Sequence, residues 1–117
     1  MNTSKDLNQL EDTAIRLDEM RDKLELDKAR FDALERLRSN SDFLYLFEEQ
    51  YFNVEAANGV KIMDSEMAYN NPTLARMNEA KIVGISALQR WLNYISIEGR
   101  MYDSRLASLE EEIDNVQ

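Results

Sequence analysis

Two stretches of this chain, one near each end, carry apolar residues at alternating steps of three and four positions. The spacing runs unbroken over residues 85–116, and it runs over residues 10–34 with polar residues at Thr13 and Asp27. Such spacing places one narrow apolar stripe along a helix. A narrow stripe suits packing along a second helix better than packing on a broad core. The two stretches therefore predict two long helices that pair with each other.

Few residues in this chain interrupt a helix. It contains three Gly and one Pro in 117 residues, and 44% of its residues are hydrophobic, which is enough to offset the entropy of ordering the chain. At this length we expect a single helical domain over residues 1–117. Its caps and breaks predict two long helices and two short ones. The long helices are expected over 5–38 and 73–115, and the short ones over 42–50 and 54–68.

Three polar segments mark the expected breaks. The run 39–41, Ser-Asn-Ser, predicts a turn and a cap for the following helix. Asn53 follows a Tyr-Phe pair and is expected to cap the third helix. Asn71 and Pro72 fit the cap and the first position of the last helix, where Pro needs no partner for an N–H group. We therefore expect an all-α fold, a long antiparallel hairpin with two short helices at one end. The hairpin would be a coiled coil of the first and last helices.

The charges beside the two apolar stripes are opposite in sign. Basic residues flank the first stripe and acidic residues the last, so each stripe should pair with the other rather than with its own copy. The expected register places Leu17 by Leu109 and Leu24 by Tyr102. The residues assigned to helix pairing are Leu17, Leu24, Phe31, Leu92, Tyr102, Leu109, Arg16, Glu112, Arg30 and Glu98, with Arg16 near Glu112 and Arg30 near Glu98.

The same register makes two further predictions about polar residues. It sets Asp27 opposite Gly99, where a small residue would leave space and water for a carboxylate. It also brings Lys23 close to Arg105, a pair of like charge. The stripes can also pair between two chains, so pairing within or between chains stays open, and we expect a homo-oligomer.

Half of the aromatic residues of the chain lie between positions 43 and 52. Trp91 and Tyr94 add a second apolar stripe to the last helix. The simplest interpretation is ordinary core, because aromatic side chains dominate small cores. The alternative is a surface that binds another protein. The candidates for such contacts are Phe43, Tyr45, Phe47, Tyr51, Phe52 and Trp91.

The sequence lacks the residues of the common catalytic and metal sites. It has no His and no Cys, so imidazole bases, thiol nucleophiles and the usual zinc ligands are absent. A net charge of -9 disfavours binding to a nucleic-acid backbone. No apolar run approaches the roughly 20 residues that cross a bilayer. We therefore expect no catalytic residue, no cofactor, no metal, no nucleic acid and no membrane contact, and the protein is expected not to be an enzyme.

A pattern in the middle of the chain suggests its origin. It consists of the run 37–43, the pair Tyr51-Phe52 before Glu55-Ala56, and the apolar spacing over 80–99. This pattern resembles small, largely uncharacterised α-helical proteins of tailed bacteriophages. Those sequences more often carry Pro at the position of Ser41 and Gly at the position of Gln50. The resemblance implies a phage protein and brings no catalytic residues with it.

Together these features predict a non-enzymatic structural or virion-assembly protein, located in the virion or the host cytoplasm. It would act through contacts between helices, with copies of itself or a larger virion component as partner. The alternative is a phage-encoded regulator that binds and inhibits a host protein, its acidic surface engaging a basic site. A cellular coiled-coil adaptor is a third possibility. The residues leave the identity of the partner open.

Overall fold

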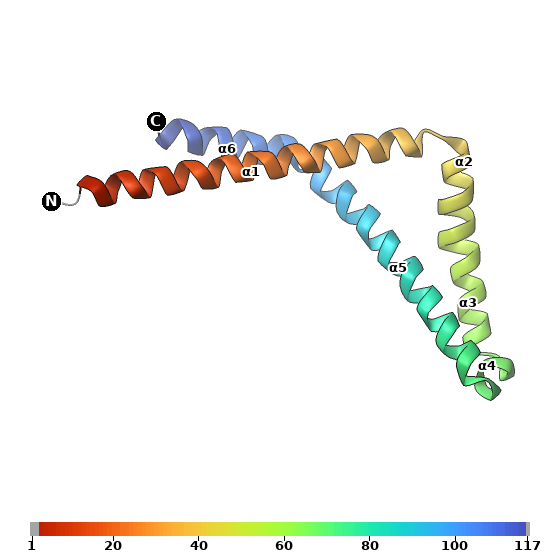
Figure 1. The fold of residues 1–117 in the computed structure, drawn as a ribbon. Helices are drawn as coiled ribbons and strands as arrows, with labels where there is room; N and C mark the ends of the chain where they lie inside the picture. The colour runs from red at the N-terminus through yellow and green to blue at the C-terminus, as the bar shows by residue number, and fades with distance from the viewer. Residues whose placement is uncertain (1–2, 117) are drawn as a thin grey trace. The chain divides into compact units, whose positions relative to one another are not determined.

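A computed structural model describes residues 3–116, and all the regular structure in that range is helical (Figure 1). The all-α prediction is therefore confirmed. The elements in chain order are α1 (Thr3–Arg38), α2 (Ser41–Phe43), the π-helix η1 (Leu44–Glu55), α3 (Ala56–Met63), α4 (Glu66–Asn70), α5 (Pro72–Arg100) and α6 (Tyr102–Val116).

The first break falls where the sequence predicts it. Helix α1 contains no Gly or Pro, and it ends with Arg36 and Arg38 in its last turn, where basic residues complement the helix dipole. Asn40 then adopts an extended conformation, and its side-chain oxygen accepts hydrogen bonds from the N–H groups of Asp42 (2.9 Å) and Phe43 (3.3 Å). Asn40 is thus the cap of the next helix.

The break predicted at Asn53 is wrong. Helical structure continues from Ser41 to Met63 through η1, and the N–H of Ala56 donates to the backbone oxygen of Asn53. A polar residue does not stop a helix when neither Gly nor Pro follows closely. The chain turns instead at residues 64–65, where the Ser65 hydroxyl accepts a hydrogen bond from the N–H of Ala68 (3.4 Å) and caps α4. The predicted short helix over 54–68 is therefore divided.

The last helix begins as predicted but is interrupted. Asn71 accepts a hydrogen bond on its side-chain oxygen from the N–H of Leu74 (3.1 Å), and Pro72 is the first residue of α5. Met101 then separates α5 from α6, although the N–H of Arg105 still donates to the Met101 carbonyl (3.0 Å). Gly99, two residues before the interruption, weakens the helix there. The single helix predicted over 73–115 is thus two segments.

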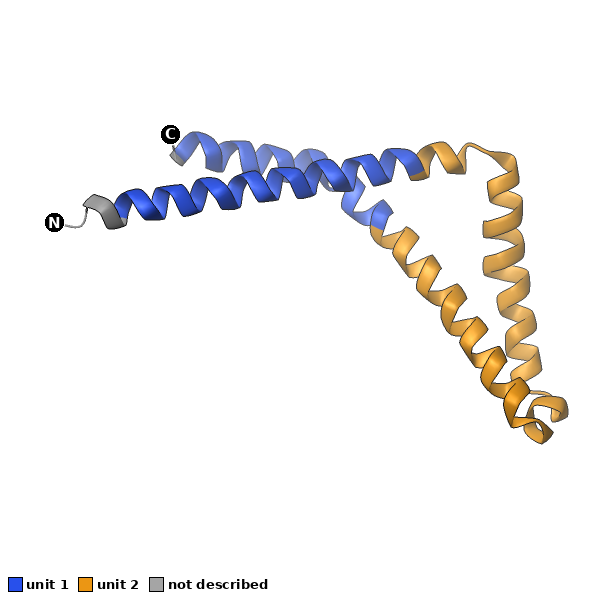
Figure 2. Cartoon of the chain, in the orientation of Figure 1, with its two compact units in different colours: residues 1–33, 95–117 blue, residues 34–94 orange. Residues whose placement is uncertain are grey.

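The chain packs as two compact units, shown in Figure 2. Unit 1 comprises residues 1–33 and 95–117, and unit 2 comprises residues 34–94. A compact unit is a grouping by packing and not a test of independent folding. The single domain therefore stays a prediction.

The core of unit 1 lies between α1 and α6. Leu17, Leu24 and Leu109 are buried in one cluster, and the half-buried side chains packed against that cluster are Tyr102, Leu106 and Ile113. Phe31, farther along α1, packs on Gly99, which precedes α6. The two helical segments of unit 1 therefore run in opposite directions, as Figure 2 also shows. The segments cover each other's apolar stripes in part, since Leu10 and Met20 of the α1 stripe are exposed.

The core of unit 2 is small and lies mainly between the helices before and after α4. Its most buried residue is Ile85, with 1% of its surface exposed. Asn78 is buried, and its side-chain amide donates to the Gly59 carbonyl (2.7 Å). A Cβ atom at Gly59 would lie 2.8 Å from Cγ1 of Ile82. Glycine at position 59 thus permits the close approach of α3 and α5.

Candidate protein-interaction surface

An aromatic column runs along one side of α2 and η1. The rings of Phe43 and Phe47 stack with centroids 5.1 Å apart, and Phe47 meets Tyr51 edge to face at 6.3 Å. Tyr51 in turn contacts Phe52 at 5.7 Å. The column forms because Phe43, Phe47 and Tyr51 recur every four residues, which places them on successive turns. Both ring geometries are favourable for aromatic pairs.

The aromatic candidates divide between core and surface. Phe52 is buried, and Phe43 and Tyr51 are half-buried, so the interpretation as core fits these three residues. Tyr45 and Trp91 have 53% and 50% of their surface exposed. Exposed aromatic side chains of this size are typical of protein-binding surfaces.

The first turn of η1 carries four consecutive apolar residues that are all exposed. These residues, Leu44, Tyr45, Leu46 and Phe47, form what we call the apolar turn. Four successive residues pass once around a helix, so the apolar turn is apolar on every side. A helix of this kind is normally buried. The sequence indicates this surface, since no polar residue interrupts positions 43–47, but the predicted contact residues include only its aromatic members.

The charges near the apolar turn are all negative. Every charged residue between positions 39 and 60 is acidic. Two of these carboxylates are paired within unit 2: Glu48 accepts a hydrogen bond from Nε of Arg38 (3.0 Å), and Glu55 pairs with Lys81. Asp42 and Glu49 are exposed and have no ion pair within residues 6–115. The apolar turn therefore lies, in sequence, between two carboxylates that make no ion pair within residues 6–115.

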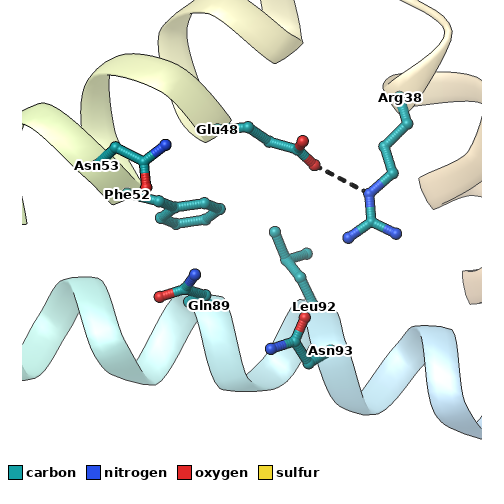
Figure 3. A pocket seen from close by; sticks show the side chains of 7 residues that line it. All are labelled: Arg38, Glu48, Phe52, Asn53, Gln89, Leu92 and Asn93. Atoms are coloured by element: carbon teal, nitrogen blue, oxygen red, sulfur yellow. Dashed lines mark hydrogen bonds and ion pairs between the residues drawn. The ribbon is translucent and has the colours of Figure 1, made fainter.

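A polar cavity of about 280 Å³ lies between η1 and α5, and Phe52 of the aromatic column lines it (Figure 3). Phe52 and Leu92 supply its apolar walls, and the Arg38–Glu48 pair lies at one side. The remaining lining residues carry carboxamide groups and are Asn53, Gln89 and Asn93. Such a cavity offers hydrogen bonds and one ion pair to a polar group, but no nucleophile activated by a neighbouring base.

A second cavity, of about 260 Å³, lies near α4 in the same unit. Its lining residues are mostly apolar and include Met63, Ala68 and Tyr69. Tyr69 has 89% of its surface exposed, and Met63 and Met67 are exposed nearby. Methionine side chains adapt to different partners, so this end of unit 2 extends the accessible apolar surface.

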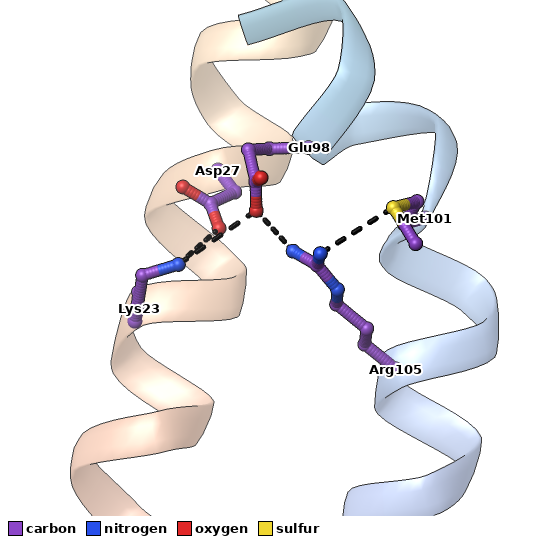
Figure 4. A network of polar contacts seen from close by, with 5 residues as sticks. All are labelled: Lys23, Asp27, Glu98, Met101 and Arg105. Atoms are coloured by element: carbon purple, nitrogen blue, oxygen red, sulfur yellow. Dashed lines mark hydrogen bonds and ion pairs between the residues drawn. The ribbon is translucent and has the colours of Figure 1, made fainter. Parts of the chain in front are cut away.

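Unit 1 contains a polar network that joins its helical segments (Figure 4). Nζ of Lys23 lies 3.2 Å from Asp27 and 3.8 Å from Glu98, and Arg105 pairs with the same Glu98 oxygen. The like charges of Lys23 and Arg105, which the predicted register brings together, are thus joined through one carboxylate. Arg105 also donates to Sδ of Met101 (3.3 Å). The network ties α1 to the start of α6 and the end of α5.

Asp27 is not placed as the sequence suggests. The three atoms closest to the Cβ position of Gly99 all belong to Phe31, and Asp27 has only 4% of its surface exposed. Water access therefore does not stabilise this carboxylate, and Lys23 does. The prediction failed because Phe31, on the next turn of α1, is large enough to fill the space beside a glycine.

The structure brings together some, but not all, of the residues that were predicted to pair the two helices. Leu17, Leu24, Leu109 and Tyr102 come together in unit 1, whereas Leu92 lines the polar cavity of unit 2. Among residues 6–115 no ion pair joins Arg16 to Glu112 or Arg30 to Glu98. The hydrophobic part of the pairing is thus formed by five of the predicted residues, because Phe31 also packs across the segments on Gly99. The charges that meet are those of Lys23, Glu98 and Arg105.

The described residues offer neither a metal site nor a membrane-spanning helix. Within the part of the chain that the structure describes, no group of three or more Asp or Glu residues could hold a metal ion. No described helix is both long enough and apolar enough to cross a bilayer. No protein-family model, curated protein or solved structure matches this chain.

Proposed function

We propose that this protein is a non-enzymatic assembly protein of a tailed bacteriophage that binds another protein through the apolar turn of η1. The phage setting rests on the resemblance of residues 37–99 to small phage proteins. The binding function rests on one observation, the exposure of four consecutive large apolar residues at positions 44–47. The protein would work in the virion or in the host cytoplasm during virion assembly.

The free energy available from the apolar turn supports this role. Removing a Leu or Phe side chain from water contributes about 1.5–3 kcal/mol. Leu46 and Tyr45 expose 57% and 53% of their surface, so most of this contribution is unused within the chain. Tyrosine is also among the residues that contribute most at protein interfaces. A partner that covers the apolar turn would gain this contribution.

Unit 1 is proposed to serve as the scaffold, as an antiparallel coiled coil of α1 with the end of α5 and α6. The buried cluster of Leu17, Leu24 and Leu109 supports this, as does the 3–4 spacing of both stripes. A polar residue inside such a seam specifies register at a cost in stability, and Asp27 occupies a seam position on α1. Unit 1 has fewer exposed large apolar residues than unit 2, and Leu10, Ile15 and Leu26 are among them.

Mass spectrometry of purified virions from the source phage tests the proposal. The wild-type chain should be found in particles or in assembly intermediates. The double variant Tyr45→Ser, Leu46→Ser should be absent from them, while the control Val83→Ser, which removes another exposed apolar residue of unit 2, should be retained. Absence of the wild-type chain from particles and intermediates, together with a monomer in native mass spectrometry, would contradict the proposal.

A second function, a regulator that binds a host protein, is supported by the unpaired carboxylates of Asp42 and Glu49. An acidic surface beside apolar side chains suits a basic site on a host enzyme. Pull-down from uninfected host lysate distinguishes the two functions. A regulator should retain one host protein in a salt-sensitive manner, and an assembly protein should not.

A further inference from the structure

We infer that the outer side of α5 joins two copies of this chain in an antiparallel pair, with Trp91 of each copy packed on Ala80 of the other. The residues that carry this inference lie on an α-helix of unit 2 and are separate from the apolar turn of η1. The proposed function at the apolar turn therefore does not depend on this pairing.

An apolar stripe runs along α5 on the side away from the core of unit 2. The buried residues Asn78, Ile85 and Leu92 define the core side of this helix. The residue before each of them lies about 100° away around an α-helix. These preceding residues belong to a run with alternating steps of three and four positions, which keeps its members on one narrow side. We call this run the outer stripe, and its members are Met77, Ala80, Gly84, Ala87, Trp91 and Tyr94.

The described part of the chain leaves the outer stripe uncovered. All six residues are exposed, and Met77, Trp91 and Tyr94 expose 67%, 50% and 43% of their surface. Among the described residues, nothing beyond the local helix backbone lies within 4 Å of a Cβ position built at Gly84. Charged residues make up 32% of the sequence, yet none falls on the outer stripe. Because a solvated side of a helix normally carries charge, this stripe is expected to pack on another helix.

The order of side-chain sizes makes the outer stripe complementary to its own inverted copy. In a pair with two-fold symmetry, residue i of one copy meets residue j of the other, and j meets i. The symmetric antiparallel register has its centre between Gly84 and Ala87, where small residues let the helices approach closely. The large indole of Trp91 then packs on a small residue, as dense packing requires. The three kinds of layer in this pair are Met77 with Tyr94, Ala80 with Trp91, and Gly84 with Ala87.

A parallel pair of outer stripes fits less well. It would set Trp91 against Trp91 and Gly84 against Gly84, two turns apart on the same helices. The two indoles would hold the helices apart at one layer, and the glycines would then leave a void at the other. Crowded layers and voids both reduce stability, so the stripe favours the antiparallel orientation.

The charges beside the outer stripe permit the antiparallel pair. Arg90 would lie on one side of the contact, near Val83 of the other copy. Lys81, which pairs with Glu55 within its own chain, would lie on the opposite side near Leu88 of the other copy. Residues on the same flank of two antiparallel helices meet each other, and here each cation meets an apolar side chain. Like charges are therefore kept apart in this register, so they do not oppose association.

Sedimentation equilibrium of the full chain tests the pairing. The contact is about 25 Å long, from 17 residues at 1.5 Å each, and is small for a protein interface, so we expect a Kd in the micromolar range. Ala87→Glu should weaken the dimer about tenfold or more, because it places a carboxylate in the central layer. Ser86→Glu adds the same charge at the next exposed position, off the outer stripe, and should change the Kd less than about threefold. Circular dichroism of both variants should match that of the wild-type chain.

Cysteine variants test the orientation of the pair. The natural chain has no cysteine, so Met77→Cys and Tyr94→Cys each introduce a single thiol at an exposed position. When the two variants are mixed and mildly oxidised, a disulfide should join one chain of each kind. Neither variant should crosslink with itself, because like positions lie about 25 Å apart in the antiparallel pair.

Four results would overturn the inference. A wild-type chain that stays monomeric far above micromolar concentration would show that no pair forms. Equal weakening by Ala87→Glu and Ser86→Glu would place the contact elsewhere, and self-crosslinking of either cysteine variant would show a parallel pair. Loss of a different bound protein in Ala87→Glu, with the wild-type chain monomeric, would show that another partner covers the stripe. The proposed function is judged by virion association of Tyr45→Ser, Leu46→Ser, so the two proposals can fail separately.

Discussion

In unit 1 apolar residues of two helical segments form one buried cluster, although Leu10, Met20 and Leu26 are exposed, whereas in unit 2 most large apolar residues are exposed and four of them are consecutive. Leu17, Leu24 and Leu109 of unit 1 are buried together. The apolar turn of unit 2, residues 44–47, surrounds its helix and is exposed on every side. A stripe can be covered by a single neighbouring helix, but a helix that is apolar all round needs more than one. Unit 2 therefore has surface left for a partner.

The two units also differ in how their charged residues are paired. In unit 1 the charges of Lys23, Glu98 and Arg105 meet one another, so the helical segments complement each other. In unit 2 the carboxylates of Asp42 and Glu49 make no ion pair among the residues that the structure describes. The ion pairs of unit 1 thus join its two helical segments, whereas two carboxylates beside the apolar turn of η1 are left without an ion pair.

Substitution of Leu24 should have the largest effect on stability. Leu24→Ala removes a side chain that is 7% exposed in the core of unit 1, so the free energy of unfolding should fall by about 2–5 kcal/mol. Leu26→Ala, two residues away and 48% exposed, should change it by less than about 0.5 kcal/mol. Urea denaturation followed by circular dichroism measures both values. Similar values would mean that the stripe of α1 is not buried as described.

Alanine at Gly99 should have the next largest effect. Its Cβ would overlap the side chain of Phe31, so the segments of unit 1 would have to separate, at a cost of about 1–3 kcal/mol. Gly84→Ala in unit 2 is the matched control, because no atom lies within 4 Å of its Cβ position. That variant should be stabilised by up to about 1 kcal/mol, since Ala favours helix. If Gly84→Ala were destabilised and Gly99→Ala were not, the close contact of Gly99 with Phe31 and the open space at Gly84 would both be wrong.

Loss of Lys23 should have a smaller effect. Lys23→Gln removes the ion pair between Lys23 and the buried Asp27, but Lys23 itself is largely exposed, so the expected loss of unfolding free energy is about 1 kcal/mol. Arg16→Gln makes the same change of charge at a residue with no ion pair among those described, and should cost less than about 0.5 kcal/mol. Thermal unfolding of the two variants side by side tests the role of the network. Equal losses of stability in the two variants would show that the network does not stabilise unit 1.

Substitutions in the apolar turn of η1 should have the smallest effect on the free energy of unfolding. Tyr45→Ser and Leu46→Ser alter side chains that are more than half exposed, so each should change the free energy of unfolding by at most about 0.5 kcal/mol. The same double variant should lose partner binding. A large loss of stability would show that the apolar turn contributes to the core of unit 2. That result would remove the difference between the units on which the proposed function rests.

The sequence predicts the helices and their caps well where a strong local signal exists. Asn40 and the Asn71–Pro72 pair act where expected, because a side-chain oxygen accepting from the first free N–H groups is a local interaction. The expected cap at Asn53 failed because nothing near it breaks a helix. The interruption at Met101 is not expected from the apolar spacing, which continues through it, although Gly99 weakens the helix there.

The candidate surface was predicted only in part for a similar reason. Spacing alone does not distinguish an aromatic side chain in the core, such as Phe52, from one at the surface, such as Tyr45. The distinction depends on which side of η1 faces α5, and the π-helix alters that orientation from the one expected for an α-helix. The role of Glu98 between Lys23 and Arg105 was missed because its expected partner was Arg30.

The most direct test of the account is a disulfide between positions 17 and 109. The natural chain has no cysteine, so the pair Leu17→Cys, Leu109→Cys gives a clean background. If unit 1 is a pair of antiparallel segments closed within one chain, mild oxidation should join the two positions inside a monomer, visible as a mobility change on non-reducing gels. A crosslinked dimer, or failure of this pair while Leu17→Cys with Tyr102→Cys succeeds, would contradict the account.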